Sequence, residues 1–323
     1  MRNSSYASSN ALFYSAFLVA AVLAIQLPCE PAPKRQQPSQ SGEGQSAIWV
    51  SFNFNVRDNH DHPIRSLSAN QVHISVDGKE QTIESLIPVS PHPISIVFLV
   101  DQSNSRRAGL RGNIYPELQP ALDCFRRLLA SGASVQVAEF DNEPKPEGGF
   151  STTVPDLFNS MQKLARSEPG GATALFDSLA WASKQVTQRP GYRAIIVTTD
   201  GDDNLSRLGP NASIAEAQAA KASLYFVNLS RVEGVENESL IRRETNTLTE
   251  LARRAGGESQ ILDNPLGAKA IFDRIAEDIT TSYNVSFRLD SAKPQLELQS
   301  LKITVDGHRL KVFAPSGNYA LPH

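Results

Sequence analysis

The period of the hydrophobic pattern changes twice along the chain and divides it into three parts. Apolar and polar residues alternate in residues 47–93 and again in residues 282–323, which is typical of β-strands with one buried face. In residues 94–281, continuous apolar runs alternate with segments of helical periodicity, as in a parallel sheet covered by helices. We predict an α/β fold class: a doubly wound parallel sheet with a small discontinuous β-sandwich domain formed by the flanking segments.

The middle part is organised around Ile94–Val100, which is apolar almost throughout and does not alternate. Such a run is expected where a strand is buried on both faces at the centre of a parallel sheet. Further strands are expected at Val135–Phe140, Ala194–Thr199, Ala222–Leu229 and Ser259–Leu262, with helices around residues 118–129, 157–165, 175–186, 213–221, 241–255 and 268–279.

The first flank begins with strict alternation over Ile48–Val56, which predicts a half-buried strand whose other face carries Ser51, Asn53 and Asn55. The polar stretch Asp58–Pro63 after it predicts a turn.

Two Asp-Gly pairs predict hairpin turns. Asp77-Gly78 would join Val72–Val76 to a returning strand at Gln81–Ile87. In the second flank, Asp306-Gly307 would turn the preceding strand into Leu310–Phe313.

The amino terminus resembles a targeting segment. Residues 11–27 are apolar except for Ser15 and Gln26, and follow a short region whose cation is Arg2. We expect residues 1–29 to be a signal peptide or an N-terminal membrane anchor, with a membrane tether through residues 11–27 in the second case. Residues 30–46, rich in Pro, Gln, Ser and Gly, predict a disordered linker. The protein would then be exported: periplasmic, envelope-anchored or secreted.

The composition narrows the range of partners. A net charge of −3 gives no reason to expect nucleic acid. The pairs Arg126-Arg127, Arg242-Arg243 and Arg253-Arg254 are expected on separate helices, as parts of solvated faces and not of one basic patch. With Cys29 and Cys124 as its two cysteines, the chain has no disulfide framework or zinc motif, and Cys124 is expected to be a buried free thiol.

Oxygen-bearing side chains follow three predicted strands or turns. Asp101, Ser103 and Ser105 come after the central strand, Thr173 follows a Gly-Gly turn, and Asp200 ends the strand at Ala194–Thr199. Loops at the carboxyl edge of a parallel sheet face the same side, so these residues can converge. An all-oxygen set without His or Cys suits Mg²⁺, with Mn²⁺ or Ca²⁺ as alternatives. Because hydroxyls leave the cation short of negative charge, an acidic group from a partner would complete its shell.

Simpler interpretations exist for each residue. Asp101 with its serines could form an Asx turn, Thr173 could be a helix N-cap, and Asp200-Gly201 could be an ordinary turn. Asp202 and Asp203 are better interpreted as a solvated acidic loop than as a second cation site. His60 and His62 are better interpreted as parts of a polar hairpin loop than as a metal pair.

Together, Asp101-x-Ser103-x-Ser105, Thr173 in Gly-Gly-Ala-Thr and Asp200 in Val-Thr-Thr-Asp-Gly resemble the von Willebrand factor A domain, whose motif is the metal-ion-dependent adhesion site (MIDAS). The resemblance implies that the serines and the threonine reach the metal directly, while the carboxylates act through water. One departure is Arg106-Arg107, which places cations near the site and would lower its affinity for metal.

The flanks resemble the bacterial VWFA-related family. They share its strand–Asp-Gly–strand segment before the A domain and its closing motif, here Leu310-Lys311-Val312 and Gly317-Asn318-Tyr319. The resemblance covers roughly residues 47–320. It implies a β-domain at residues 47–93 and 282–323 around a VWA domain at residues 94–281.

We therefore expect a non-enzymatic, exported protein-binding or adhesion module, whose cation accepts an Asp or Glu side chain from a protein partner. One alternative is a structural scaffold of the envelope with a vestigial metal site. A second is a Mg²⁺-dependent phosphohydrolase resembling the haloacid dehalogenases, with Asp101 as nucleophile. That chemistry needs a second carboxylate two residues on, where this chain has Ser103, and a local proton-transfer group, which the sequence does not supply.

Overall fold

The computed structural model describes residues 47–90, 93–104, 117–229, 238–290 and 297–320. All of them belong to one compact unit, Gln45–His323. None of the described helices is long and apolar enough to cross a membrane. The predicted signal peptide or anchor at residues 1–29 and the predicted linker at residues 30–46 lie outside the described residues.

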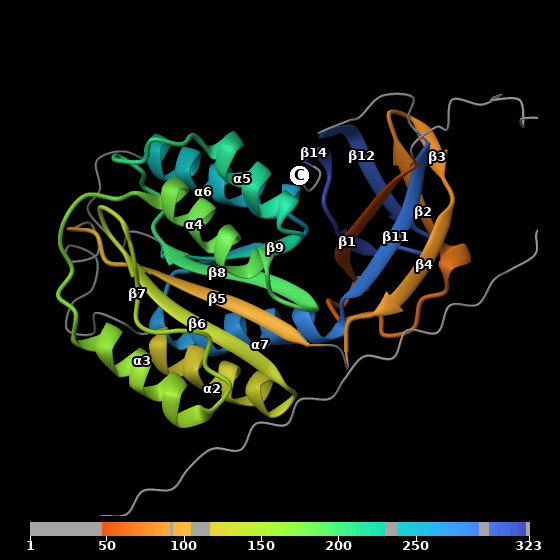
Figure 1. Ribbon diagram of the computed structural model, residues 1–323. Coiled ribbons are helices and arrows are strands. Elements are labelled where there is room, and N and C mark those ends of the chain that lie inside the picture. Colours follow the sequence, from red (N-terminus) through yellow and green to blue (C-terminus); the bar gives the residue numbers. More distant parts are fainter. Residues whose placement is uncertain (1–46, 91–92, 105–116, 230–237, 291–296, 321–323) are drawn as a thin grey trace, which may run out of the picture. The chain divides into compact units, whose positions relative to one another are not determined.

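The α/β part is built on a six-stranded sheet with the order β10-β9-β8-β5-β6-β7 (Figure 1). Its strands are β5 (Ile94–Asp101), β6 (Ala133–Phe140), β7 (Pro144–Pro146), β8 (Tyr192–Thr199), β9 (Ala222–Leu229) and β10 (Ser259–Leu262). Every neighbouring pair is parallel except β6 and β7. The predicted parallel sheet is confirmed, with β7 as an additional antiparallel edge strand. Its two prolines are tolerated because an edge strand needs fewer backbone donors.

Helices cover both faces of this sheet (Figure 1). One face carries α2 (Leu118–Ala130), α3 (Val154–Arg166) and α7 (Ala268–Thr281), and the other carries α4 (Leu175–Thr187), α5 (Pro210–Ala219) and α6 (Glu238–Arg254). In β5, Phe98 packs into the first hydrophobic core and Val97 and Leu99 into the second. The strand is therefore apolar on both sides, and the absence of alternation is explained. Cys124 of α2 is a buried free thiol, as predicted, and burial raises its pKa to about 12.

The flanking segments form two antiparallel four-stranded sheets. The first flank also contains a short 3-10 helix at Ala69–Gln71, and the α/β part contains another at Pro265–Gly267, just before α7. One has the order β13-β1-β11-β4, with β13 (Lys311–Phe313), β1 (Ala47–Arg57), β11 (Tyr283–Asp290) and β4 (Ile83–Pro88). The other has the order β14-β12-β2-β3, with β14 (Gly317–Ala320), β12 (Glu297–Val305), β2 (Val72–Val76) and β3 (Lys79–Gln81). They share one hydrophobic core, in which the rings of Phe52 and Tyr319 meet edge-on at 5.8 Å between centroids. The predicted discontinuous β-sandwich is confirmed.

The chain enters and leaves the α/β part at one place. Strands β4 and β11 are hydrogen-bonded neighbours, with Pro88 opposite Tyr283. Just beyond them, the Val89 amide donates to the Ser282 carbonyl at 2.8 Å. The α/β part is therefore inserted between two adjacent strands of one sheet.

Two of the predicted strand connections are different in the structure. Asp77-Gly78 joins β2 to β3 as expected, with positive φ at both residues. However, Gln81–Ile87 is not one returning strand, because β3 and β4 belong to different sheets. The predicted hairpin at Asp306-Gly307 is also wrong, since β13 pairs with β1 and not with β12. An Asp-Gly pair favours a tight turn but does not determine which strand the chain pairs with afterwards.

Strand β1 is buried on both faces over much of its length, and not on one face as predicted. Asn53, Asn55 and Arg57 are only 7, 1 and 2 % exposed. Their face of the strand turns towards the α/β part: the Lys221 Nζ atom donates to the Ser51 hydroxyl at 2.7 Å, and the Asn53 amide reaches the Lys221 carbonyl at 3.5 Å. A polar face with period two can thus be an internal contact surface.

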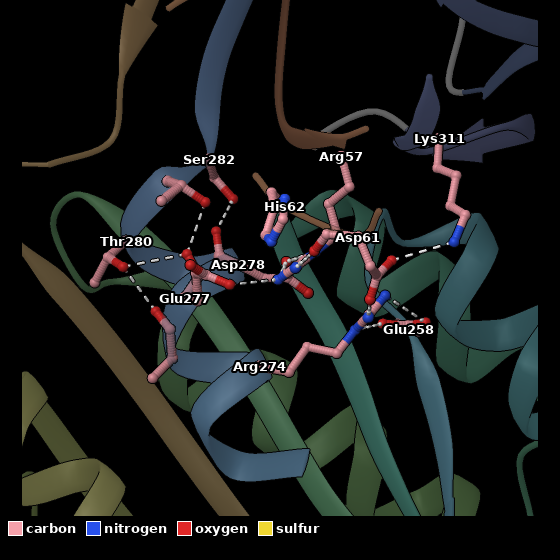
Figure 2. Close-up of polar contacts among 12 residues, drawn as sticks. Arg57, Asp61, His62, Glu258, Arg274, Glu277, Asp278, Thr280, Ser282 and Lys311 are labelled. Carbon is pink, nitrogen blue, oxygen red and sulfur yellow. Dashed lines mark hydrogen bonds and ion pairs between the residues drawn. The ribbon is translucent and has the colours of Figure 1, made fainter. Parts of the chain in front are cut away.

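An ion-pair cluster joins β1 to α7 (Figure 2). The Arg57 guanidinium donates to Asp278 at 2.6 and 2.8 Å and to Glu277 at 3.3 Å. Arg274 of the same helix contacts Asp61 in the loop after β1, and binds Glu258 through two guanidinium nitrogens at 2.7 and 3.1 Å. This cluster connects the flanking sheet to the last helix of the α/β part.

Candidate metal site

Asp101 is the last residue of β5, and its carboxylate is held in place on both oxygens. The residue is 2 % exposed. The Ser103 amide donates to Oδ1 at 2.9 Å, and the Thr199 hydroxyl donates to Oδ2 at 2.6 Å. Burial raises the pKa of Asp101 to about 6, and the negative charge of Asp200 adds to this effect, while the hydrogen bonds from Thr199 and Ser103 act in the opposite direction.

The loop after β5 is tied to the Gly-Gly turn before α4. The Gly170 amide donates to the Gln102 carbonyl at 2.7 Å, and the Asn104 amide donates to the Gly171 carbonyl at 3.2 Å. Ser103 lies between these two bonds and is 1 % exposed. Segments about 70 residues apart in sequence are therefore adjacent at the carboxyl edge of the sheet.

Thr173 is bound to the loop that follows β8. Its carbonyl accepts from the amides of Asn204 and Leu205 at 3.1 and 3.0 Å, and its own amide donates to the Asn204 side chain at 2.9 Å. Thr173 is 1 % exposed. The alternative interpretation as a helix N-cap does not hold, because α4 begins at Leu175 with Ala174 at the N-cap position.

Asp200 lies immediately after β8 and is half-buried. Its Oδ1 accepts from the Asp202 amide at 3.2 Å, and its charge acts on Asp101. Of the five predicted ligands, the structure thus places Asp101, Ser103, Thr173 and Asp200 on three mutually bonded loops. Ser105, together with Arg106-Arg107, lies outside the described residues.

The residues present fit a hard divalent cation. The described part of the chain contains no group of three or more His, Cys, Asp or Glu residues that could hold a metal ion. A cation held here would depend on the carboxylates of Asp101 and Asp200, supplemented by hydroxyls. Burial of Asp101 close to Asp200 places two like charges together, which a cation would stabilise. Ser103 and Thr173 would supply neutral oxygen ligands.

Sequence reasoning missed two residues that shape this edge of the sheet. Thr199 donates to Asp101, and its hydroxyl also accepts from the Gly201 amide at 3.1 Å. Its only signal was its position beside Asp200 at the end of a buried strand. Asn204 positions Thr173 through its side chain, as described above. Neither role follows from spacing along the chain.

The acidic loop after β8 is structural and not merely solvated. Asp203 accepts from the Phe176 amide at 3.0 Å and from the Ser206 hydroxyl at 2.6 Å, so it holds the first turn of α4. Asp177 of that turn accepts in return from the amides of residues 207 and 208 at 3.0 and 2.9 Å. These bonds fix the loop that carries Asp200 against the helix that follows Thr173.

The histidine pair lies in a polar turn, as preferred from the sequence. The amides of His60 and His62 both donate to Asp58 Oδ1, at 2.8 and 2.9 Å. Asp58 thereby closes the turn after β1.

Comparison with known proteins gives one family match. Residues 96–202 match the model of the von Willebrand factor type A domain. No curated protein matches the chain.

Solved structures with a similar fold share little sequence with the chain. The PilB minor pilin from Streptococcus sanguinis is 15 % identical, with a TM-score of 0.43, over 62 % of this chain and 63 % of that one. BatB from Bacteroides thetaiotaomicron is 18 % identical, with a TM-score of 0.44, over 57 and 98 %. Proximal thread matrix protein 1 from the mussel byssus, solved with zinc in its MIDAS motif, is 15 % identical, with a TM-score of 0.47, over 62 and 48 %. The chain thus covers less than two thirds of the PilB minor pilin and of proximal thread matrix protein 1.

Proposed function

We propose that this chain, whose residues 96–202 form a domain of the von Willebrand factor type A family, is an exported, non-enzymatic protein-binding module with a metal-dependent adhesion site. Ser103 and Thr173, together with Ser105, would contact a Mg²⁺ or Mn²⁺ ion, while Asp101 and Asp200 would act through water. The ion would accept an Asp or Glu carboxylate from a partner protein.

One observation carries this proposal: three separate loops are hydrogen-bonded together at the carboxyl edge of the sheet, and they bury Asp101 beside Asp200. A cation bound beside Asp101 and Asp200 would stabilise the ionised form of the buried carboxylate. The hydrogen bonds from Ser103 and Thr199 fix its orientation before any ion arrives.

The site does not favour catalysis. None of the six histidines of the chain lies between residues 94 and 281. A nucleophilic Asp101 would also need a positioned acid or base, and its two oxygens are engaged by Ser103 and Thr199. The family whose model residues 96–202 match consists mostly of non-enzymatic binding modules.

The first test is titration of the full chain with Mn²⁺. Asp101→Asn and Thr173→Val should each abolish saturable binding, while Thr173→Ser should retain it. Thr187→Val is the matched control, because its hydroxyl donates to the Ser183 carbonyl within α4, away from the candidate site. Absence of binding at millimolar Mn²⁺ and Mg²⁺ would favour the scaffold alternative.

The second test addresses the partner. Immobilised full chain should capture envelope proteins in Mg²⁺ and release them in EDTA, and Thr173→Val should capture none. Capture that is unchanged by EDTA would contradict the metal-dependent mechanism. Steady turnover of p-nitrophenyl phosphate that is lost in Asp101→Asn would instead support the phosphohydrolase alternative.

A further inference from the structure

Helix α6 places four arginines on one element, at positions 242, 243, 253 and 254. The expectation of separate helices is therefore wrong for these two pairs. Arg242, Arg243 and Arg254 line one groove of about 590 Å³ against the first turn of α5. Asn211 of α5 and Asn246 of α6 line it as well. Basic residues from two separate pairs in the sequence thus gather at one site.

Arginines outnumber acidic residues among the side chains that line this groove. Glu250 is the one acidic residue among those that line it. Its carboxylate is bound by Arg253, through two guanidinium nitrogens at 2.6 and 2.8 Å, and this contact lowers its pKa. Glu250 is therefore ionised and already engaged by an arginine outside the groove.

Two guanidiniums at opposite ends of the groove are available to an anion. Arg254 donates to the neutral amide oxygen of Asn211 at 2.7 Å. Among the described residues, no carboxylate forms an ion pair with Arg243 or Arg254. A guanidinium held by an amide keeps its full charge and retains further N–H groups for a ligand.

Arg243 and Arg254 lie far apart along α6, so the groove runs parallel to this helix. Arg243, Thr247 and Arg254 follow one face of the helix at intervals of four and seven residues. At about 1.5 Å per residue, the backbones of Arg243 and Arg254 are roughly 16 Å apart. Polar Asn246 and Thr247 lie between them and offer neutral hydrogen-bonding groups. A ligand that contacts both ends must be elongated.

We propose that the α5–α6 groove binds an elongated anion with several phosphate groups, separately from the candidate metal site. The planar guanidinium fork matches the oxygens of a phosphate group in pairs. Two such forks at opposite ends of a polar groove favour a chain of phosphates over a single one. The volume lies within the range of ordinary ligand sites.

The test is isothermal titration of the full chain with tripolyphosphate, in EDTA and without divalent cations, so that the candidate metal site plays no part. Arg243→Gln/Arg254→Gln should weaken binding at least tenfold. Asn246→Asp, which keeps every arginine and adds one negative charge in the groove, should also weaken it. Arg166→Gln on α3 is the matched control, since this exposed arginine lies on the opposite face of the sheet.

Three results would overturn the proposal: no binding of tripolyphosphate, equal affinity in the double variant, or inorganic phosphate binding as tightly as tripolyphosphate. Thr173→Val should bind tripolyphosphate as the unchanged protein does. A failure of the anion-binding proposal therefore does not argue against the adhesion function. A failure of the adhesion function does not argue against anion binding. Circular dichroism of each variant checks that the fold is retained.

Discussion

Arg57 of β1 and Asp278 of α7, although 221 residues apart in sequence, form a buried ion pair in which two guanidinium nitrogens share one carboxylate oxygen. Their side chains are 3 and 1 % exposed. Burial raises the pKa of Asp278, while the charge of Arg57 acts in the opposite direction. Burying either charge alone is unfavourable, and each charge offsets this cost for the other.

Removing one partner of this pair should destabilise the protein strongly. Arg57→Met leaves a buried carboxylate without its cation, and we expect the free energy of unfolding to fall by about 3–5 kcal/mol. Arg57→Met/Asp278→Leu should recover most of that loss, because no buried charge remains. Urea unfolding of the full chain measures both variants.

The control for this prediction is Arg65→Met. Arg65 pairs with Glu277 of the same helix but is exposed, so its loss should cost less than about 1 kcal/mol. An equal effect of Arg57→Met and Arg65→Met would show that the buried pair has no special role.

The second prediction concerns the pH dependence of the metal-free protein. The pKa of Asp101 is about 6 in the folded chain and has an ordinary value of 3.8. Because the folded value is the higher one, the stability that Asp101 contributes is present below about pH 4 and is lost as the pH rises through 6. The maximum loss is about 3 kcal/mol.

Asp101→Asn carries no charge and should lack this loss, so in EDTA it should be more stable than the unchanged chain at pH 7.5 but not at pH 4. Urea unfolding at both pH values tests this difference. Asp123→Asn, at an exposed site on α2, should keep the original pH dependence. If Asp101→Asn and Asp123→Asn gave the same dependence, Asp101 would not be the titrating group.

The third prediction concerns the turn between α6 and β10. A Cβ atom on Gly257 would lie 2.1 Å from the Leu224 carbonyl oxygen and 2.7 Å from its carbon, both in the backbone of β9. Since neither can move without disturbing the sheet, Gly257→Ala should lower the free energy of unfolding by at least about 2 kcal/mol. Gly149→Ala, where nothing lies within 4 Å, should change it by less than about 1 kcal/mol. Thermal unfolding of the two variants compares them, and equal stability would refute the steric argument.

Sequence reasoning succeeded where a residue's environment is set by its own strand. The apolar run at Ile94–Val100 predicted burial on both faces, and cores on both sides of β5 confirm it. The carboxyl-edge rule predicted that Asp101, Ser103, Ser105, Thr173 and Asp200 converge, and hydrogen bonds join the loops that carry four of them. Ser105 lies outside the described residues. Their role in holding a metal stays a prediction.

It failed where the environment is supplied by a distant part of the chain. The alternation in β1 predicts an apolar and a polar face, but cannot say that Lys221 and Asp278 cover the polar one. The same limit applies to Thr199, whose bond to Asp101 spans 98 residues. Side-chain polarity alone does not separate a hydrated surface from a satisfied internal contact.

The adjacent entry and exit of the α/β part, where Val89 bonds to Ser282, have a consequence for protein engineering. A short glycine loop between β4 and β11 would replace everything between them and leave those two strands in register. The surface uncovered by this excision would display Asn53, Asn55 and Arg57, which water can hydrate. The same place in the sandwich is therefore a candidate position for grafting other inserts whose ends lie close together.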